Sequence, residues 1–163
     1  MTVAPRISVQ AEDFDIAAEI ERLTAGRKDI GAVVTFTGRC RDEGGTLAAL
    51  ELEHYPGMAE AEIGRVAREA SERWRLKGLT VIHRYGKIPA GENIVLVAAC
   101  SESRKAAFEA ADFLMDYLKS RAPFWKKEHR ADGTAGVPSA MPSPWALATA
   151  SFSQASNRPI GSP

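Results

Sequence analysis

The chain has 163 residues, of which 45% are hydrophobic and 26% are charged, with 21 Lys and Arg residues balanced by 21 Asp and Glu residues. These values predict one folded domain and exclude an intrinsically disordered chain, because the chain is long enough and apolar enough to bury a core. The formal net charge of zero also excludes a global attraction to nucleic acid or to an anionic membrane. An anion site would therefore need a local cluster of basic residues.

The first third of the chain predicts a helix between extended segments. Residues 7–9 favour a short strand, after which Asp13 is placed to cap a helix with apolar residues at helical spacing. Residues 31–38 (GAVVTFTG) are a β-branched run ended by glycine, and residues 50–54 (LELEH) alternate strictly, so both are predicted strands. A charged loop, RCRDEGG, follows the first of them.

The middle of the chain predicts a second helix followed by two strands. Between Met58 and Trp74 the apolar residues fall on one helical stripe with Glu and Arg opposite, as in an amphipathic helix. Residues 79–85 and 93–100 are strand-like, and the Pro and Gly of residues 88–92 supply turn geometry between them. We expect these two strands to pair as a hairpin.

A third helix is predicted from about Ser103 to Arg121, where Pro123 stops it, and residues 124–128 (FWKKE) are predicted to be extended. The chain lacks strict β-α-β alternation, so the element order favours an α+β fold with a mixed or antiparallel sheet and about three helices. The expected buried stripe of the third helix is Ala107, Phe108, Ala111, Leu114, Met115 and Leu118.

The composition changes near Gly133, after which Pro, Ser, Ala and Gly dominate and few residues could anchor a core. Such a segment buries too little apolar surface to offset the entropy of ordering it. We therefore predict one domain over residues 1–132 and a flexible tail over residues 133–163.

The two cysteines, Cys40 and Cys100, form neither a CxxC pair nor a metal-ligand cluster with the three histidines. The longest apolar run, residues 94–100, is too short to span a bilayer, and the N-terminus has no apolar signal segment. We therefore expect a cytoplasmic protein with no metal site and no membrane anchor.

The densest positive segment is residues 119–130 (KSRAPFWKKEHR), where five Lys or Arg residues stand against one Glu. This segment could form an anion site, in which two neighbouring lysines such as Lys119 and Lys126 would lower each other's pKa. Strand alternation places Trp125 and Lys126 on opposite sides, so core aromatics could anchor the lysine. Alternatively, these residues only complement the dipole of the preceding helix and form a solvated strand face.

Two further segments could bind anions. Ser103 and Arg104 open the third helix, where free backbone N–H groups favour phosphate; alternatively Ser103 is only the N-cap. Arg39 and Arg41 follow a predicted strand and could bind phosphate through two guanidiniums, or could form local ion pairs with Asp42 and Glu43. Cys40 between them could be a low-pKa thiolate that carries a persulfide, or a structural residue.

Five segments, taken in order, resemble the large subunit of molybdopterin synthase, the MoaE family. They are GAVVTFTGRCR (31–41), LELEHYPGM (50–58), TVIHRYGKI (80–88), SRKAAFEA (103–110) and MDYLKSRAPFWKKE (115–128). The resemblance covers about residues 6–130. HYPGM, VIHR and KSRAPFWKKE in this order and spacing are specific to that family.

This resemblance implies an α/β-hammerhead-like fold and a homodimer of large subunits within a heterotetramer, each holding a small ubiquitin-like, MoaD-like subunit. The small subunit ends in a thiocarboxylate, which enters the large subunit and supplies sulfur to cyclic pyranopterin monophosphate. Two transfers form the dithiolene of molybdopterin, so the family is a sulfurtransferase of molybdenum cofactor biosynthesis. No metal and no bound redox cofactor are implied.

By motif, the resemblance implies that Lys119 is the principal catalytic lysine and that Lys126 assists it. It assigns Arg39, Arg41 and Arg104 to substrate binding, together with Cys40 and Ser103 beside them. Family members often have His where this chain has Ser103. Lys127 and Glu128 fall in the same substrate-binding stretch, and Arg73 matches an arginine that could act across the dimer.

We expect Arg41, Arg104, Lys119 and Lys126 to meet in a single crevice that fits a phosphorylated ring system and a glycine tail. Two alternatives remain open from the residues. One is a non-catalytic module that binds anions or nucleic acid through residues 119–130, against which the balanced net charge argues. The other is a sulfurtransferase that uses a Cys40 persulfide.

Overall fold

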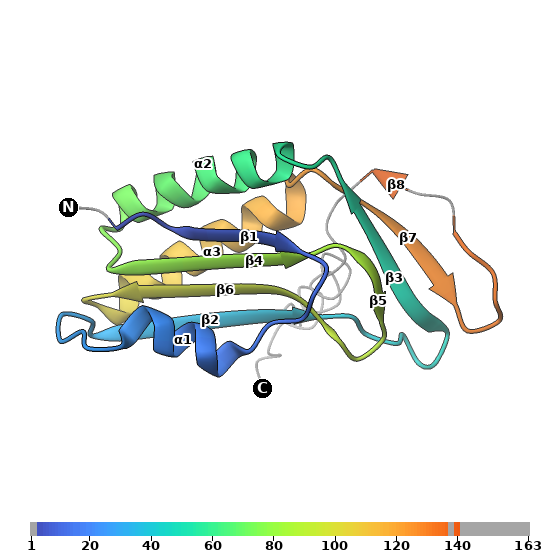
Figure 1. Cartoon of the computed structure of the whole chain (residues 1–163), viewed down its shortest axis with the longest axis horizontal. Coiled ribbons are helices and arrows are strands. Elements are labelled where there is room, and N and C mark those ends of the chain that lie inside the picture. Colours follow the sequence, from blue (N-terminus) through green and yellow to red (C-terminus); the bar gives the residue numbers. More distant parts are fainter. Residues whose placement is uncertain (1–2, 137–138, 141–163) are drawn as a thin grey trace, which may run out of the picture.

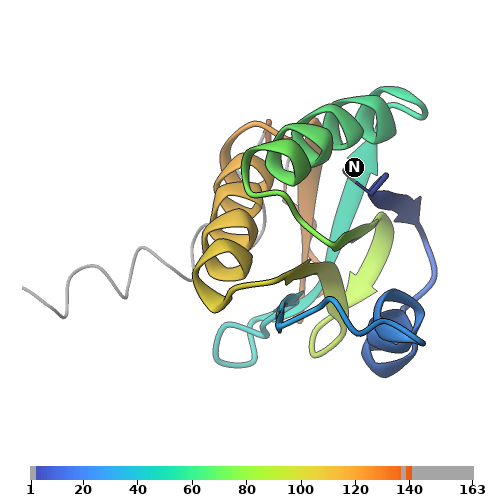
Figure 2. The same cartoon turned by 90° about the vertical axis from the view of Figure 1, so that its left-hand side faces the viewer.

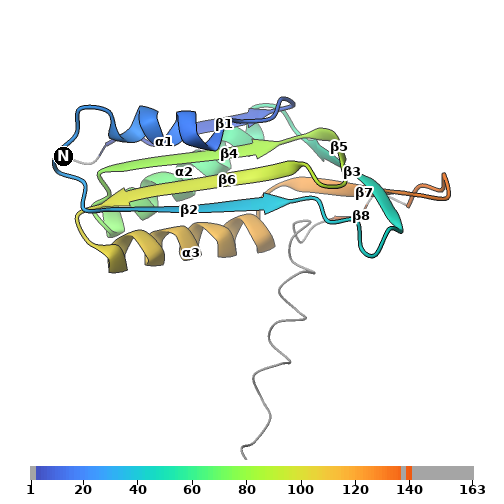
Figure 3. The ribbon, with the colours of Figure 1, turned by 90° about the horizontal axis from the view of Figure 1, so that it is seen from below.

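The structure, a computed structural model, describes residues 3–136 and 139–140. The described residues form two four-stranded sheets and three helices (Figure 1). The strand order is β1-β4-β6-β2 in the first sheet, called sheet A, and β5-β3-β7-β8 in the second, called sheet B. Sheet B lies at the end of sheet A where β2 ends and β6 begins (Figure 1, Figure 3).

Sheet A is mixed, as predicted. The strands β4 and β6 pair antiparallel as predicted, although a further strand rather than a simple turn connects them. Both are buried along almost their whole length. The edge strand β2 pairs antiparallel with β6, whereas β1 pairs parallel with β4. Their bounds are β1 Arg6–Gln10, β2 Ala32–Arg39, β4 Gly78–Arg84 and β6 Asn93–Ser101.

Sheet B is built around β3, which pairs antiparallel with both β5 and β7. The chain leaves sheet A after β4 through Gly86, whose φ of 86° favours glycine, and it pairs with β3 before it returns to β6. The two strands predicted around the charged loop, β2 and β3, therefore lie in different sheets. The strands of sheet B are β3 Leu47–His54, β5 Gly86–Pro89, β7 Phe124–Arg130 and β8 Ser139–Ala140.

The three predicted helices are present as α1 (Ile16–Thr24), α2 (Met58–Arg73) and α3 (Arg104–Ser120). The helices α2 and α3 cover one face of sheet A, and α1 covers the opposite face (Figure 2). The core lies between sheet A and the α2–α3 layer and continues into sheet B through Leu50, Leu52 and Phe124.

Three details differ from the sequence prediction. The N-cap of α1 is Asp15, which accepts a hydrogen bond from the Ala18 N–H at 3.0 Å, rather than Asp13. Two residues of the predicted buried stripes lie on the surface, since Met58 and Phe108 are 51% and 59% exposed. Periodicity assigns a residue to a helix face, but only the neighbouring elements decide whether that position is covered.

The described chain continues past residue 132, where we predicted the domain to end. The Gly136 N–H donates to the Glu128 carbonyl at 2.8 Å, and Ser139 and Ala140 pair with β7. Residues 133–136 and 139–140 thus extend sheet B. The rest of the predicted tail, residues 137–138 and 141–163, lies outside the described residues.

Candidate functional site

Lys119 lies in the last turn of α3, beside a groove of about 330 Å³ between α3 and the edge strand β2. Most of the groove is apolar, with Val34 and Phe36 from β2 facing Phe108 and Met115 from α3. Asp112 and Asp116 also line it. Lys119, a half-buried residue, therefore lies at a mostly apolar surface that remains open to a ligand.

The aromatic residues of this groove were not predicted as site residues. Phe36 is 37% exposed and Phe108 is 59% exposed, although aromatic residues of this size usually contribute to a core. Phe108 was assigned to the buried stripe of its helix, because helical spacing cannot distinguish a core position from the wall of an open groove. The edge position of β2 explains the difference, since among the described residues no strand pairs with its outer side.

Lys126 lies on β7, where the predicted alternation is confirmed. Trp125 packs edge-on against Tyr55 with ring centroids 4.9 Å apart, whereas Phe124 stacks on the buried His83 at 3.8 Å. Lys126 shares the face of Phe124 by strand periodicity. Its side chain is 15% exposed and its Nζ lies 3.5 Å from Glu128 Oε1, so the strand and an ion pair restrain the amine.

The neighbours of Lys126 divide between the two faces of β7. Glu128 shares the Lys126 face and lies 3.9 Å from Arg130 as well, so it partly neutralises this cluster. Lys127 belongs by alternation to the face of Trp125 and His129, and His129 pairs there with Glu51 at 2.7 Å. The structure therefore does not bring Lys127 together with Lys126.

Arg39 and Arg41 lie at the end of β2 that points toward sheet B. The Arg39 guanidinium donates to the Gly91 carbonyl, and Arg41 is exposed in the loop that follows. In the part of the chain that the structure describes, neither arginine forms an ion pair with Asp42 or Glu43, and Asp42 accepts from the Gly44 N–H at 3.2 Å instead. Both guanidiniums remain available to an anion from solvent.

Cys40 does not fit the role of a substrate-binding or sulfur-carrying residue. Its side chain is only 1% exposed and belongs to the hydrophobic core. Burial raises the pKa of its thiol, because an apolar surrounding disfavours the thiolate. Burial therefore disfavours the low-pKa thiolate that a persulfide carrier requires, which argues against the persulfide alternative.

Ser103 is the N-cap of α3, because its Oγ accepts a hydrogen bond from the Ala106 N–H at 3.3 Å. The helix start lies beside the beginning of β2, where the Gly31 N–H donates to the Ser101 carbonyl at 2.9 Å. A Cβ on Gly31 would overlap the Glu102 carbonyl oxygen, so glycine permits this close approach. Arg104, in the first turn, is exposed.

Arg73 ends α2 at this same side of the molecule. Its guanidinium lies 4.5 Å from the centre of the Trp74 ring and 5.7 Å from that of Phe113, both within cation–π range. The indole N–H of Trp74 donates to Glu109 at 2.9 Å. Arg73 is therefore held on an aromatic surface near the start of α3.

The predicted site residues thus fall into two groups at opposite ends of sheet A (Figure 3). Arg104 and Lys119 are fifteen positions apart along α3, which places their Cα atoms about 22 Å apart along the helix. The expectation that both meet in one crevice of a single chain is therefore wrong. The first group contains Arg39, Arg41, Lys119 and Lys126, and the second contains Arg73, Ser103 and Arg104.

Other kinds of site find no support in the described part of the chain. Over residues 3–136 and 139–140, no three His, Cys, Asp or Glu side chains gather as metal ligands would. None of the helices described is long and apolar enough to cross a membrane.

The fold and the first group of residues define an α+β protein with a mostly apolar groove that has Lys119 in its lining and can take an extended chain next to a cationic side chain. A family model described as MoaE protein matches residues 9–121. The chain belongs to the MoaE family.

Curated relatives agree with this assignment. A protein of Mesorhizobium japonicum named molybdopterin synthase catalytic subunit is 73% identical over 134 residues, which are 82% of this chain and 84% of the relative. A protein of the same name from Brucella melitensis is 72% identical over 130 residues, 80% of each chain. The family predicted from five ordered motifs is therefore confirmed.

Solved structures resemble this fold closely. The molybdopterin biosynthesis MoaE protein from Burkholderia ambifaria aligns with a TM-score of 0.73 at 41% identity, over 90% of this chain and 98% of that one. Molybdopterin synthase from Staphylococcus aureus aligns with a TM-score of 0.68 at 30% identity, over 84% and 99%. These likenesses confirm the α+β fold with three helices and mixed or antiparallel sheets.

Proposed function

We propose that this chain is the catalytic subunit of molybdopterin synthase, a sulfurtransferase of molybdenum cofactor biosynthesis. It takes sulfur from the thiocarboxylated C-terminus of a small ubiquitin-like, MoaD-like subunit and transfers it to cyclic pyranopterin monophosphate, which becomes the dithiolene of molybdopterin. The observation that carries this proposal is the position of Lys119, a half-buried residue, in the lining of an open and mostly apolar groove in a MoaE-family fold.

The groove suits the tail of the small subunit. A Gly-Gly tail has no side chains, so it can lie extended between Phe36 and Phe108. Both of these aromatic side chains are exposed in the structure. Its terminal thiocarboxylate is anionic and would reach the amine of Lys119 at the end of α3. The names of the relatives support this arrangement, since a catalytic subunit works with another subunit.

The chemistry needs positive groups that do not reorganise during the reaction. The thiocarboxylate sulfur attacks a carbon of the pterin side chain, where the new carbon–sulfur bond replaces a carbon–oxygen bond whose oxygen leaves as water or as the phosphate oxygen. Water then cleaves the acyl–sulfur bond, so the sulfur stays on the pterin and the tail leaves as a carboxylate. Lys119 stabilises the negative charge that develops at the acyl group and the pterin side chain, and Lys126 assists from β7. Arg39 and Arg41 orient the phosphate.

The second group of residues can contribute to a substrate site only in a homodimer. Arg104 lies about 22 Å along α3 from Lys119 of the same chain, too far for both to touch one small substrate. We propose that Arg104, with Ser103 and Arg73, serves the substrate bound by the partner subunit. Two copies of this chain and two small subunits then form a heterotetramer with two equivalent sites.

We also place the protein in the cytoplasm. Its two cysteines are free thiols and are both buried in the core, which suits a reducing compartment.

A reconstitution tests the function. The purified chain is mixed with a thiocarboxylated small subunit and cyclic pyranopterin monophosphate, and dithiolene product is measured together with the small subunit consumed. We expect two thiocarboxylates to be consumed per product, and no product from a small subunit that ends in an ordinary carboxylate. Lack of product with a donor shown to be competent in another synthase would refute the proposal.

A further inference from the structure

Arg84, at the end of β4, is a charged residue buried in the described structure, and it is 7% exposed. A buried guanidinium needs hydrogen-bond partners, because its desolvation is otherwise costly. Its Nε donates to the Ala11 carbonyl at 3.1 Å, and its Nη1 donates to the Asn93 carbonyl at 2.9 Å. Glu92 Oε1 lies 3.5 Å from the same Nη1. Arg84 therefore ties the segment after β1 to the chain that enters β6.

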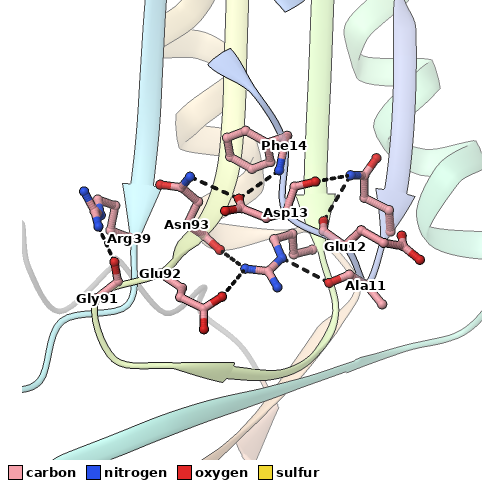
Figure 4. A network of polar contacts seen from close by, with 10 residues as sticks. Ala11, Glu12, Asp13, Phe14, Arg39, Gly91, Glu92 and Asn93 are labelled. Carbon is pink, nitrogen blue, oxygen red and sulfur yellow. Dashed lines mark hydrogen bonds and ion pairs between the residues drawn. The ribbon is translucent and has the colours of Figure 1, made fainter. Parts of the chain in front are cut away.

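The segment that Arg84 holds is in turn paired with the end of β2. The Cys40 N–H donates to the Glu92 carbonyl at 2.8 Å, and the Gly91 N–H donates to the Cys40 carbonyl at 2.6 Å. The Arg39 guanidinium donates to the Gly91 carbonyl, as Figure 4 shows. Residues 91–92 thus contact both the backbone of Cys40 and the side chain of Arg39.

The strand ladder alone does not set the position of Arg39. The pairing of β2 with β6 is regular up to Gly38 and shifts register between Gly38 and Arg39. Beyond that shift β2 is also an edge strand, so a neighbouring strand constrains it on one side only. The turn that precedes β6 therefore decides where the Arg39 guanidinium lies.

A second contact fastens the same turn. The side-chain amide of Asn93 donates to Asp13 Oδ1 at 3.1 Å, and the Phe14 N–H donates to the same oxygen at 2.8 Å (Figure 4). The Asp13 contact is at the surface, whereas the Arg84 contacts are partly buried. Arg84 is thus the more strongly held of the two supports, since buried charged hydrogen bonds are stronger than exposed ones.

We propose that Arg84 is a positioning residue for the reaction: it holds the turn at residues 91–93 so that the Arg39 guanidinium faces the phosphate of the substrate. This inference rests on the proposed function. It also gives a role to the VIHR motif, which the groove and the lysines leave unexplained. A lysine could not replace Arg84, because a single amine cannot reach two carbonyls and a carboxylate in the planar geometry of a guanidinium.

The first experiment replaces Arg84 by Lys in the full chain assembled with the thiocarboxylated small subunit. We expect the KM for cyclic pyranopterin monophosphate to rise by roughly tenfold or more, because a displacement of about 1 Å in a binding group has effects of this size. The kcat should change little, since Lys119 lies on α3, outside the Arg84 contacts. The thermal midpoint is measured on the same samples.

Arg6→Lys is the matched control. Arg6 forms two hydrogen bonds of 3.2 Å to Glu19, so it is also a guanidinium held by a carboxylate, but it contacts neither β2 nor the turn before β6. We expect Arg6→Lys to leave KM unchanged even if it lowers the thermal midpoint. An Arg84→Lys protein that has a lower thermal midpoint but an unchanged KM would overturn the proposal.

A double-mutant cycle with Arg39→Ala tests whether Arg84 acts through Arg39. If it does, Arg84→Lys raises KM in the wild-type background and adds little in the Arg39→Ala background. Additive effects overturn the proposal. If Arg39→Ala itself leaves KM unchanged, the proposed substrate role of Arg39 fails, and the inference fails with it. If Arg39→Ala raises KM and Arg84→Lys does not, only the inference fails.

A second variant covers the case in which Arg84→Lys does not fold. Asn93→Ala removes only the surface contact of the turn with Asp13. We expect a smaller rise in KM in the same direction, again suppressed in the Arg39→Ala background. An Asn93→Ala protein with unchanged KM would contradict the idea that this turn positions Arg39.

Discussion

Lys119 and Lys126 differ in how their surroundings hold them. Lys126 is fixed by β7 and by its ion pair with Glu128, whereas Lys119 borders an apolar groove that is open to a ligand. A cation beside an apolar surface interacts more strongly with a bound anion, because little water screens it. Lys119 is thus the better placed of the two to act on the reacting groups.

Replacement of Lys119 by Ala should lower turnover by roughly a hundredfold or more, the range of a single acid–base or charge-stabilising group. Dithiolene formation under single-turnover conditions measures this. Lys105→Ala is the control, because Lys105 lies on the same helix but its side chain is 85% exposed and pairs with Glu109 on the helix surface. Unimpaired turnover of Lys119→Ala would reject its catalytic role.

Cys40→Ser separates a structural cysteine from a sulfur carrier. A serine hydroxyl in this apolar position should lower the free energy of unfolding by about 1–3 kcal/mol, since a buried polar group without a partner is costly. Turnover per folded molecule should stay at the wild-type value. Urea unfolding and activity are measured together, and loss of activity in the folded variant would restore the persulfide mechanism.

His83 makes stability depend on pH. It is fully buried and stacked on Phe124, and burial lowers its pKa from 6.5 to about 4. The unfolded chain therefore binds a proton below pH 6.5 that the folded chain does not bind. Stability is thus unaffected by this group above pH 6.5 and falls as the pH is lowered from 6.5 toward 4.

Between pH 7 and pH 5 this one group should reduce the free energy of unfolding by about 2 kcal/mol. Urea unfolding at the two pH values measures the total change, and the difference between the wild type and His83→Gln isolates the contribution of His83. Equal pH dependence in the two proteins would show that His83 titrates normally in the folded state.

At the scale of the elements, α3 connects the two groups of basic residues. Its C-terminal turn carries Lys119 to the groove, and its N-terminal turn carries Arg104 to the other end of sheet A. The length of the helix, rather than any side-chain contact, therefore sets the distance between the two groups. Its ends must be well formed for both groups to be in place.

Ser103→Ala should lower the free energy of unfolding by about 1 kcal/mol, because it removes the side-chain acceptor for the Ala106 N–H. Chemical denaturation measures the loss. Ser120→Ala is the matched control at the other end of α3, since the Ser120 hydroxyl only donates back to the Asp116 carbonyl within the helix. Equal losses in the two variants would show that Ser103 does not act as a cap.

At the scale of the whole molecule, the proposed dimer predicts complementation between two inactive variants. Lys119→Ala and Arg104→Ala damage different groups, so a mixed dimer retains one site with both residues intact. If subunits mix at random, half of the dimers are mixed and half of their sites are intact, which should restore about one quarter of wild-type activity. The two variants are co-refolded with the small subunit and assayed.

A mixture of Lys119→Ala with Lys126→Ala is the control, because both residues belong to the same group of one chain. Each site of that mixed dimer carries one defect, so no activity should return. Recovery in this control, or none in the first mixture, would show that Arg104 and Lys119 do not serve a common site across the dimer.

The sequence by itself determined the local structure and the family. Apolar spacing predicted all three helices and the pairing of β4 with β6, since a buried face must repeat with the period of its element. Alternation placed Trp125 and Lys126 on opposite faces of β7. The ordered motifs identified the MoaE family, because their residue types and spacing are shared by its members.

Only the tertiary structure decided which of these faces meet. It buried Cys40, left Phe108 on the wall of a groove, and placed Arg104 and Lys119 at opposite ends of α3. It also revealed Arg84 behind Arg39. Periodicity reports that a residue faces a neighbour but not which one, because contacts between distant segments depend on how sheets and helices pack.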